Sequence, residues 1–122
     1  MYLMHGDKAL KAYDIGLGFA PLGHKQREGD GRTPEGEYKI DRRNPNSKFH
    51  LSIGISYPNA ADRAYAAKSG FSPGGDIFIH GKPRIYQDAP DDWTWGCISV
   101  SNKEIQEIYA MVQNETPITI YK

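Results

Sequence analysis

The sequence predicts a mainly β domain, built largely of antiparallel strands with one or two helices. Short runs in which apolar and polar residues alternate are typical of strands with one buried face. Thirteen glycines and eight prolines separate these runs, as turns do in β proteins. The 122 residues suffice for one hydrophobic core, so we expect a single domain over residues 1–122.

The first predicted elements are a hairpin, a long loop and a strand. Residues 1–4 and 9–19 flank a turn signal and predict the hairpin. The segment 20–36 is rich in glycine, proline and charge, which predicts a long loop of the kind that often carries function. Strand alternation resumes in residues 37–41. The alternating apolar residues of the second hairpin arm are Tyr13, Ile15, Leu17 and Phe19.

The clearest strand pattern lies in residues 49–57, where five apolar side chains alternate and would share one face. Asn59 is a suitable helix N-cap and Gly70 a suitable stop, so a short helix is predicted over residues 60–68. The five apolar residues of the strand are Phe49, Leu51, Ile53, Ile55 and Tyr57.

The second half of the chain predicts two strands and a longer helix. Residues 77–80 alternate, which places His80 at the end of a strand, where its side chain can project into a cleft. A capping box at residues 101–104 and apolar residues at helical spacing predict a helix over residues 102–113. Residues 117–121 predict a closing strand.

The composition argues against several functions. The 15 basic and 15 acidic residues cancel, so we expect no nucleic-acid partner. No segment approaches the roughly 18 apolar residues of a membrane span. The four histidines and one cysteine form neither a CxxC nor an HExxH pattern, and the run Gly29–Gly31 lacks the context of a phosphate loop. We therefore expect no metal and no cofactor.

Cys97 is the candidate nucleophile. It precedes the capped helix, whose positive end could lower the pKa of the thiol. A thiol with a pKa of about 8.5 needs a base near neutrality, and His80, seventeen positions upstream, is the best candidate. The two would meet if their strands were neighbours. On chemistry alone, a lone cysteine is more often a buried structural residue, and that alternative stays open.

Two motifs resemble the L,D-transpeptidase catalytic domain (YkuD-like) family. The run Ile79–Gly81 followed by TWGCI at residues 94–98 is similar to its histidine and its Ser/Thr-His-Gly-Cys motif. The run TPEGEY at residues 33–38 matches the Thr-Pro-x-Gly-x-Tyr segment that follows a Gly-rich loop in the family. The resemblance covers nearly the whole chain. It implies an L,D-transpeptidase-like β-sandwich with one or two short helices.

The resemblance also implies catalytic roles. Cys97 would attack a stem-peptide carbonyl and form a thioester, while His80 would take the thiol proton and return it to the leaving amine. Backbone N–H groups at Gly96 and Cys97 would stabilise the oxyanion, unless Gly96 serves only a tight turn. Gly81 would let the chain turn beside His80, with a main-chain carbonyl orienting the ring, so a dyad is expected rather than a triad.

Substrate contacts are expected on both sides of the cysteine. Trp95 stands where most members have a second histidine, and Ser99 where many have Arg or Asn, which leaves substrate details open. Trp93 and Trp95 would wall the groove or simply pack, and Thr94 would bind substrate or stabilise the turn. The run at residues 92–97 looks more like the branch that detaches the outer-membrane lipoprotein from peptidoglycan.

The long loop offers a second group of candidates. Its side chains could meet the carboxylates of a stem peptide, or the loop could simply be solvated. The residues concerned are His24, Lys25 and Arg32.

The function implied is an L,D-transpeptidase that acts on stem peptides containing meso-diaminopimelate. One alternative is a hydrolase, either an amidase or an L,D-carboxypeptidase, that uses the same Cys97 and His80. Others are a non-catalytic cell-wall binding module and a structural protein whose cysteine belongs to the core. We expect peptidoglycan stem peptides as the partner and a monomer. A periplasmic or envelope location is expected, with the export signal absent from this chain.

Overall fold

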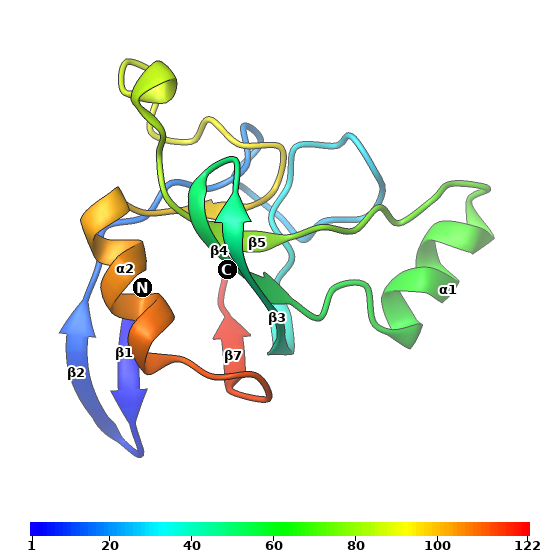
Figure 1. Ribbon diagram of the computed structural model, residues 1–122. Coiled ribbons are helices and arrows are strands. Elements are labelled where there is room, and N and C mark those ends of the chain that lie inside the picture. The colour runs from blue at the N-terminus through cyan, green and yellow to red at the C-terminus, as the bar shows by residue number, and fades with distance from the viewer.

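The computed structural model describes residues 1–122 and contains one five-stranded and one two-stranded sheet (Figure 1). The larger sheet has the strand order β6-β5-β4-β3-β7. All its neighbours are antiparallel except β5 and β6, which run parallel. Its strands are β3 (Gly36–Ser47), β4 (His50–Ile55), β5 (Phe78–His80), β6 (Ile98–Ser99) and β7 (Pro117–Ile120). The smaller sheet is the hairpin of β1 (Tyr2–His5) and β2 (Lys8–Ala12).

The structure confirms the predicted fold class, mostly β with two α-helices. Helix α1 (Ala60–Lys68) has the predicted bounds, and α2 (Asn102–Met111) ends two residues earlier than predicted. Both begin with a capping box, in which the N-cap side chain accepts the N3 amide and the N3 carboxylate accepts the N-cap amide. A short 3-10 helix, η1 (Arg84–Tyr86), lies between β5 and β6. Neither α-helix is long and apolar enough to cross a membrane.

The core lies between α2 and the middle of the larger sheet. Helix α2 packs against β4 and β5 (Figure 1). The face predicted for the strand at residues 49–57 is buried or half-buried throughout, with Ile53 and Ile55 fully enclosed. Ser52 and Gly54, on the opposite face, are buried as well, because β4 has strands on both sides and neighbours over both faces.

The predictions for the second hairpin arm and for the strand at residues 37–41 were inaccurate. Strand β2 ends at Ala12, and the extended chain beyond it forms single bridges from Gly16 to Ser99 of β6 and from Gly18 to Thr94. Phe19 is 49% exposed because its ring lies over Gly31 rather than in the core. Strand β3 continues to Ser47, well beyond residue 41, because its polar second half pairs with β4 in a hairpin.

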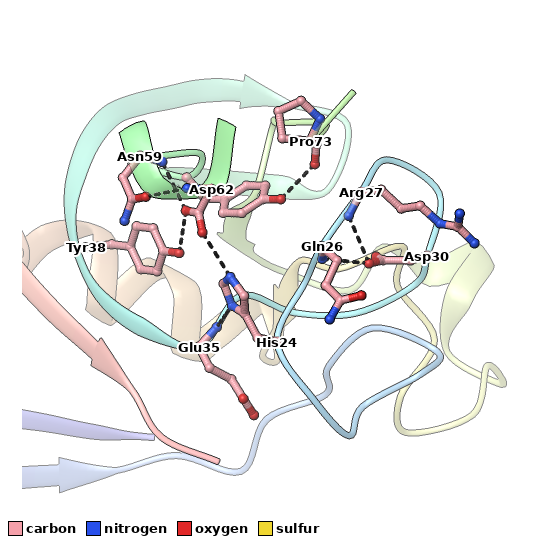
Figure 2. A network of polar contacts seen from close by, with 10 residues as sticks. His24, Gln26, Arg27, Asp30, Glu35, Tyr38, Asn59, Asp62 and Pro73 are labelled. Carbon is pink, nitrogen blue, oxygen red and sulfur yellow. Dashed lines mark hydrogen bonds and ion pairs between the residues drawn. The ribbon is translucent and has the colours of Figure 1, made fainter. Parts of the chain in front are cut away.

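The long loop predicted over residues 20–36 is present up to residue 35, and a polar cluster fastens it to α1 and β3 (Figure 2). We call His24, Tyr38, Asn59 and Asp62 the Asp62 cluster. Asp62 accepts hydrogen bonds from Tyr38 Oη at 2.7 Å and Asn59 N at 3.0 Å, and His24 Nε2 lies 2.9 Å from its other oxygen. Burial, with help from the bond to Asp62, raises the pKa of Tyr38 far above its ordinary value.

Candidate active site

Cys97 lies immediately before β6, at the end of a turn formed by Thr94–Cys97, called the cysteine turn below. The residue is half-buried. Its Sγ accepts a hydrogen bond from Phe78 N at 3.4 Å and donates one to Asp76 O at 3.4 Å. The thiol therefore rests against the first residues of β5.

The thiol is neutral in this resting arrangement. Burial raises the pKa of Cys97, and the Phe78 N–H group and the charge of Lys25 lower it without cancelling that effect. The net direction is opposite to the lowering expected from the start of α2. A base is therefore needed to generate the thiolate at neutral pH.

His80 ends β5 and is 2% exposed, between the rings of Phe49 and Trp93. The Phe49 ring stacks on the imidazole at 4.4 Å between centroids, and Trp93 meets it edge-on at 5.6 Å. Nδ1 lies 2.6 Å from Gly81 O, and because a carbonyl can only accept, Nδ1 must carry the hydrogen. Burial lowers the pKa of His80, and the bond to Gly81 opposes this only in part.

The other ring nitrogen of His80 is free to act as a base. Nε2 has no hydrogen-bond partner in the protein. Every fully buried polar side-chain atom does have a partner, so Nε2 is not fully buried and keeps access to solvent. With Nδ1 protonated, the unprotonated nitrogen of the neutral ring is Nε2. The backbone carbonyl of Gly81 occupies the place that a carboxylate takes in a triad.

The structure brings Cys97 and His80 to neighbouring strands, as the proposed pairing requires. In the parallel ladder, Ile98 pairs with Ile79 and Ser99 with His80. The two candidate side chains share no hydrogen bond, because the thiol is turned toward Asp76 O. Catalytic hydrogen bonds often form only with substrate in place.

The cysteine turn is shaped by Thr94 and Gly96. The Thr94 hydroxyl accepts from Gly96 N at 3.2 Å and donates to Cys97 O at 2.6 Å, so its hydrogen bonds stay within the turn. Gly96 has φ +136°, and a Cβ there would lie 2.7 Å from Arg32 O. Of the two expected oxyanion donors, Gly96 N–H is therefore engaged, whereas Cys97 N–H has no partner within the protein.

Close packing around residue 81 requires a glycine. A Cβ at this position would lie 2.8 Å from Phe49 O, and its own N–H donates to the same carbonyl at 2.9 Å. The backbone around His80 is thereby held against the turn that precedes β4.

The two tryptophans of this region differ in environment. Trp93 is half-buried, stacks on Tyr86 at 4.7 Å and donates from Nε1 to the buried Ser99 hydroxyl at 3.0 Å. Trp93 and Ser99 thus support the wall beside His80. Trp95 is 71% exposed, and its one aromatic neighbour is Phe19, at 5.1 Å between centroids in a T-shaped arrangement. Trp95 is therefore the aromatic that the cysteine turn presents to solvent.

The three loop candidates have separate environments. His24 has no free ring nitrogen, because Nδ1 accepts from Glu35 N at 2.8 Å and Nε2 faces Asp62 (Figure 2). Lys25 is 3% exposed and its Nζ lies 3.0 Å from Asp30 Oδ1. Arg32 is half-buried, and its guanidinium has no hydrogen-bond partner in the protein. Only Arg32 is placed to meet a ligand from solvent with free donors.

Sequence reasoning missed Asp30. Its carboxylate accepts from the backbone N–H groups of Gln26, Arg27 and Arg32 at 2.8, 3.2 and 3.1 Å, and from Lys25. Burial raises the pKa of Asp30, but the hydrogen bonds outweigh it and hold the pKa below its ordinary value. The signal was an aspartate between two glycines, a composition typical of turns in which the side chain binds its own backbone.

Two cavities flank this region, and neither is lined by Cys97 or His80. A cavity of about 340 Å³ lies between the loop and α1, with Asp30, Arg32 and Tyr65 in its wall. A larger one of about 710 Å³ is lined by Trp93 and Ser99, among others.

These features agree with a family of known architecture. Residues 1–120 match the YkuD family, the L,D-transpeptidase catalytic domain. The chain therefore belongs to the L,D-transpeptidase catalytic-domain family.

Individual relatives are longer than this chain. YafK of Escherichia coli (strain K12), provisionally named an L,D-transpeptidase, is 33% identical over 116 residues, which are 92% of this chain and 42% of YafK. The crystal structure of the helical cell shape determining protein Pgp2 from Campylobacter jejuni has a TM-score of 0.71 at 29% identity, covering 95% of this chain and 40% of Pgp2. The L,D-transpeptidase of Xylanimonas cellulosilytica DSM 15894 shares the fold, with a TM-score of 0.65 at 14% identity over 98% of this chain and 54% of its own.

Proposed function

We propose that this domain is a cysteine acyltransferase of the L,D-transpeptidase type, with Cys97 as nucleophile and His80 as base. The observation that carries the proposal is the hydrogen bond from His80 Nδ1 to Gly81 O. It leaves Nε2 unprotonated on the strand beside the cysteine. A buried structural cysteine would not explain a histidine held in this tautomer next to it.

The proposed reaction proceeds in two balanced steps. The Cys97 thiol gives its proton to His80 Nε2, and the sulfur attacks the carbonyl carbon to form a tetrahedral intermediate, whose oxyanion the Cys97 N–H group stabilises. The C–N bond then breaks, the amine leaves with the proton from His80, and a thioester remains. In the second step an amine or a water molecule gives a proton to His80 and displaces the sulfur, which regenerates the thiol.

The substrate we propose is a peptidoglycan stem peptide, attacked at the carbonyl that follows the L-centre of meso-diaminopimelate. Membership of the family supports this choice. Arg32, with free donors, and the exposed Trp95 would contact the stem near the cysteine turn. The domain would then act as a monomer in the cell envelope, where peptidoglycan lies.

The test is incubation of the purified protein with defined stem peptides and analysis of the products by mass spectrometry. Cross-linked or amine-exchanged stems would establish a transpeptidase, and shortened or released stems a hydrolase with the same residues. In either case Cys97→Ala should abolish the product, and His80→Gln should slow it by roughly 10²- to 10⁴-fold. Products that persist in Cys97→Ala, or none from any stem, would contradict the proposal.

A further inference from the structure

Lys25 is a buried cation that the proposed reaction does not yet use. A lysine side chain with only 3% exposure is uncommon, because burying an ammonium group costs several kcal/mol unless it is well paired. Its one partner is Asp30, at 3.0 Å. An ammonium group has three donors, so two N–H donors of Lys25 have no partner within the protein.

The ammonium group lies against the cysteine turn. Lys25 Nζ stands 3.6 Å from the position that a Cβ of Gly96 would take. Gly96 directly precedes Cys97, and its lack of a side chain permits this approach. The long loop therefore delivers a fixed positive charge to the backbone beside the thiol, and this charge lowers the pKa of Cys97 against the effect of burial.

Asp30 holds Lys25 in place without neutralising its field completely. Three backbone N–H groups, from Gln26, Arg27 and Arg32, share the carboxylate with Lys25, as Figure 2 shows for the first two. Hydrogen bonds from backbone dipoles disperse the negative charge of the carboxylate. We call Lys25 and Asp30 the Asp30 cluster.

We infer that Lys25 is an electrostatic positioning residue for the reaction at Cys97. Its buried ammonium stabilises the negative charge that forms on the sulfur and then on the oxygen of the tetrahedral intermediate. A low-dielectric position next to the turn makes such a fixed charge effective, because little reorganisation is needed when the charge appears. The inference rests on the proposed function only in taking Cys97 as the nucleophile.

The rival explanation is that Lys25 and Asp30 form a clamp that merely shapes the loop. The two explanations predict different shifts of the Cys97 pKa in two variants. A clamp is broken equally by Lys25→Met and Asp30→Asn, so both variants would change the thiol in the same way. A fixed charge is removed by Lys25→Met but left uncompensated by Asp30→Asn, so the two variants should act differently.

The experiment measures the rate of alkylation of Cys97 by iodoacetamide as a function of pH, on the whole chain and with no substrate. Cys97 is the only cysteine, so the signal belongs to one thiol. The other ionisable groups that face it are Asp76 before β5, Arg42 on β3 and His80 on β5, and all remain unchanged in these variants. Thermal unfolding of each variant is recorded alongside.

In Lys25→Met the midpoint of the profile should move to higher pH, and alkylation near pH 7 should slow by roughly three- to tenfold. Lys25→Arg should stay near the wild type, and Asp30→Asn should leave the midpoint unchanged or lower it. An unchanged midpoint in folded Lys25→Met, or an upward shift in Asp30→Asn, would overturn the inference. If Lys25→Met did not fold, the direction of the midpoint shift in Asp30→Asn would still distinguish a fixed charge from a clamp.

This result is separable from the stem-peptide assay. A profile that depends on Lys25 in a protein that converts no stem would retain the inference and reject the proposed function. Turnover that depends on Cys97, together with a profile indifferent to Lys25, would do the reverse.

Discussion

Two buried polar clusters hold the same loop, yet they differ in what lies beyond them. The Asp62 cluster joins the loop to α1 and β3, and its groups satisfy one another: Tyr38, His24 and a backbone amide all bond to one carboxylate (Figure 2). The Asp30 cluster is also built around one carboxylate that accepts several hydrogen bonds, but its cation has two unused donors and lies against the cysteine turn. Both carboxylates are well supplied with donors, so what distinguishes the Asp30 cluster, and supports the role proposed for Lys25, is the pair of unused donors close to Cys97.

The largest effect should come from breaking the Asp62 cluster with Asp62→Ala. The change leaves the Tyr38 hydroxyl and the His24 ring without their partner and removes half of the α1 capping box. Unpaired buried groups and a lost cap together should lower the free energy of unfolding by about 3 kcal/mol. Urea denaturation measures this. Tyr38→Phe removes one of the bonds and should cost about 1 kcal/mol.

The same variant also sharpens the comparison. In the folded fraction of Asp62→Ala, the alkylation profile of Cys97 should match the wild type, because Asp62 is not among the groups with the largest effect on the pKa of the thiol. A displaced midpoint would mean that the two clusters are coupled and that the Asp62 cluster does more than hold the fold.

The next largest effect on stability should come from Gly96→Ala, in the cysteine turn. The new Cβ would collide with the Arg32 carbonyl at 2.7 Å, and φ +136° is unfavourable for any residue with a side chain. We expect a loss of about 2 kcal/mol in thermal or urea unfolding. Gly29→Ala is the matched control: it has φ +82° but nothing within 4 Å, so only backbone strain applies and about 1 kcal/mol is expected.

A smaller effect should appear as a dependence of stability on acid pH. The pKa of Asp30 is lower in the folded protein than in the unfolded chain, so its contribution is complete above the ordinary carboxyl pKa of about 3.9. It is lost as the pH falls from there through the folded pKa. Urea unfolding from about pH 6 to about pH 2 should show a shallower acid decline in Asp30→Asn than in the wild type. Equal slopes would show that Asp30 contributes no net linkage.

The parts of this fold that were predictable from sequence are those with local causes. Asn59 and Ser101 each set a helix start through a capping box read within four residues, and both helices were found. Strand β6 was missed because two residues carry no periodicity, and its existence depends on pairing with β5 and on the bridge from Gly16. Strand pairing over such distances is a tertiary property that propensity does not contain.

The candidate site divides in the same way. Cys97 and His80 were predictable because motifs carry them, and Gly81 because a glycine next to a histidine implies a tight backbone. The burial of Lys25 was not, since a charged loop is usually solvated and the approach of Lys25 to Gly96 is a tertiary contact. The orientation of the Cys97 thiol could not be predicted either, because the carbonyl to which it donates belongs to Asp76, twenty-one residues away.

The smallest effect on stability is expected for Trp95→Ala, because the side chain is 71% exposed and has a single aromatic neighbour, Phe19. The free energy of unfolding should change by less than about 0.5 kcal/mol. If Trp95 contacts the stem peptide, KM should rise by roughly three- to tenfold with kcat nearly unchanged, because a contact made equally in the ground and transition states affects binding alone. Tyr121→Ala, at an aromatic residue that directly follows β7 and is 83% exposed, should alter neither constant. A fall in kcat with KM unchanged would instead place Trp95 among the groups that act in the transition state. The residues proposed to assist the reaction at Cys97 would then include the exposed Trp95 as well as the buried Lys25.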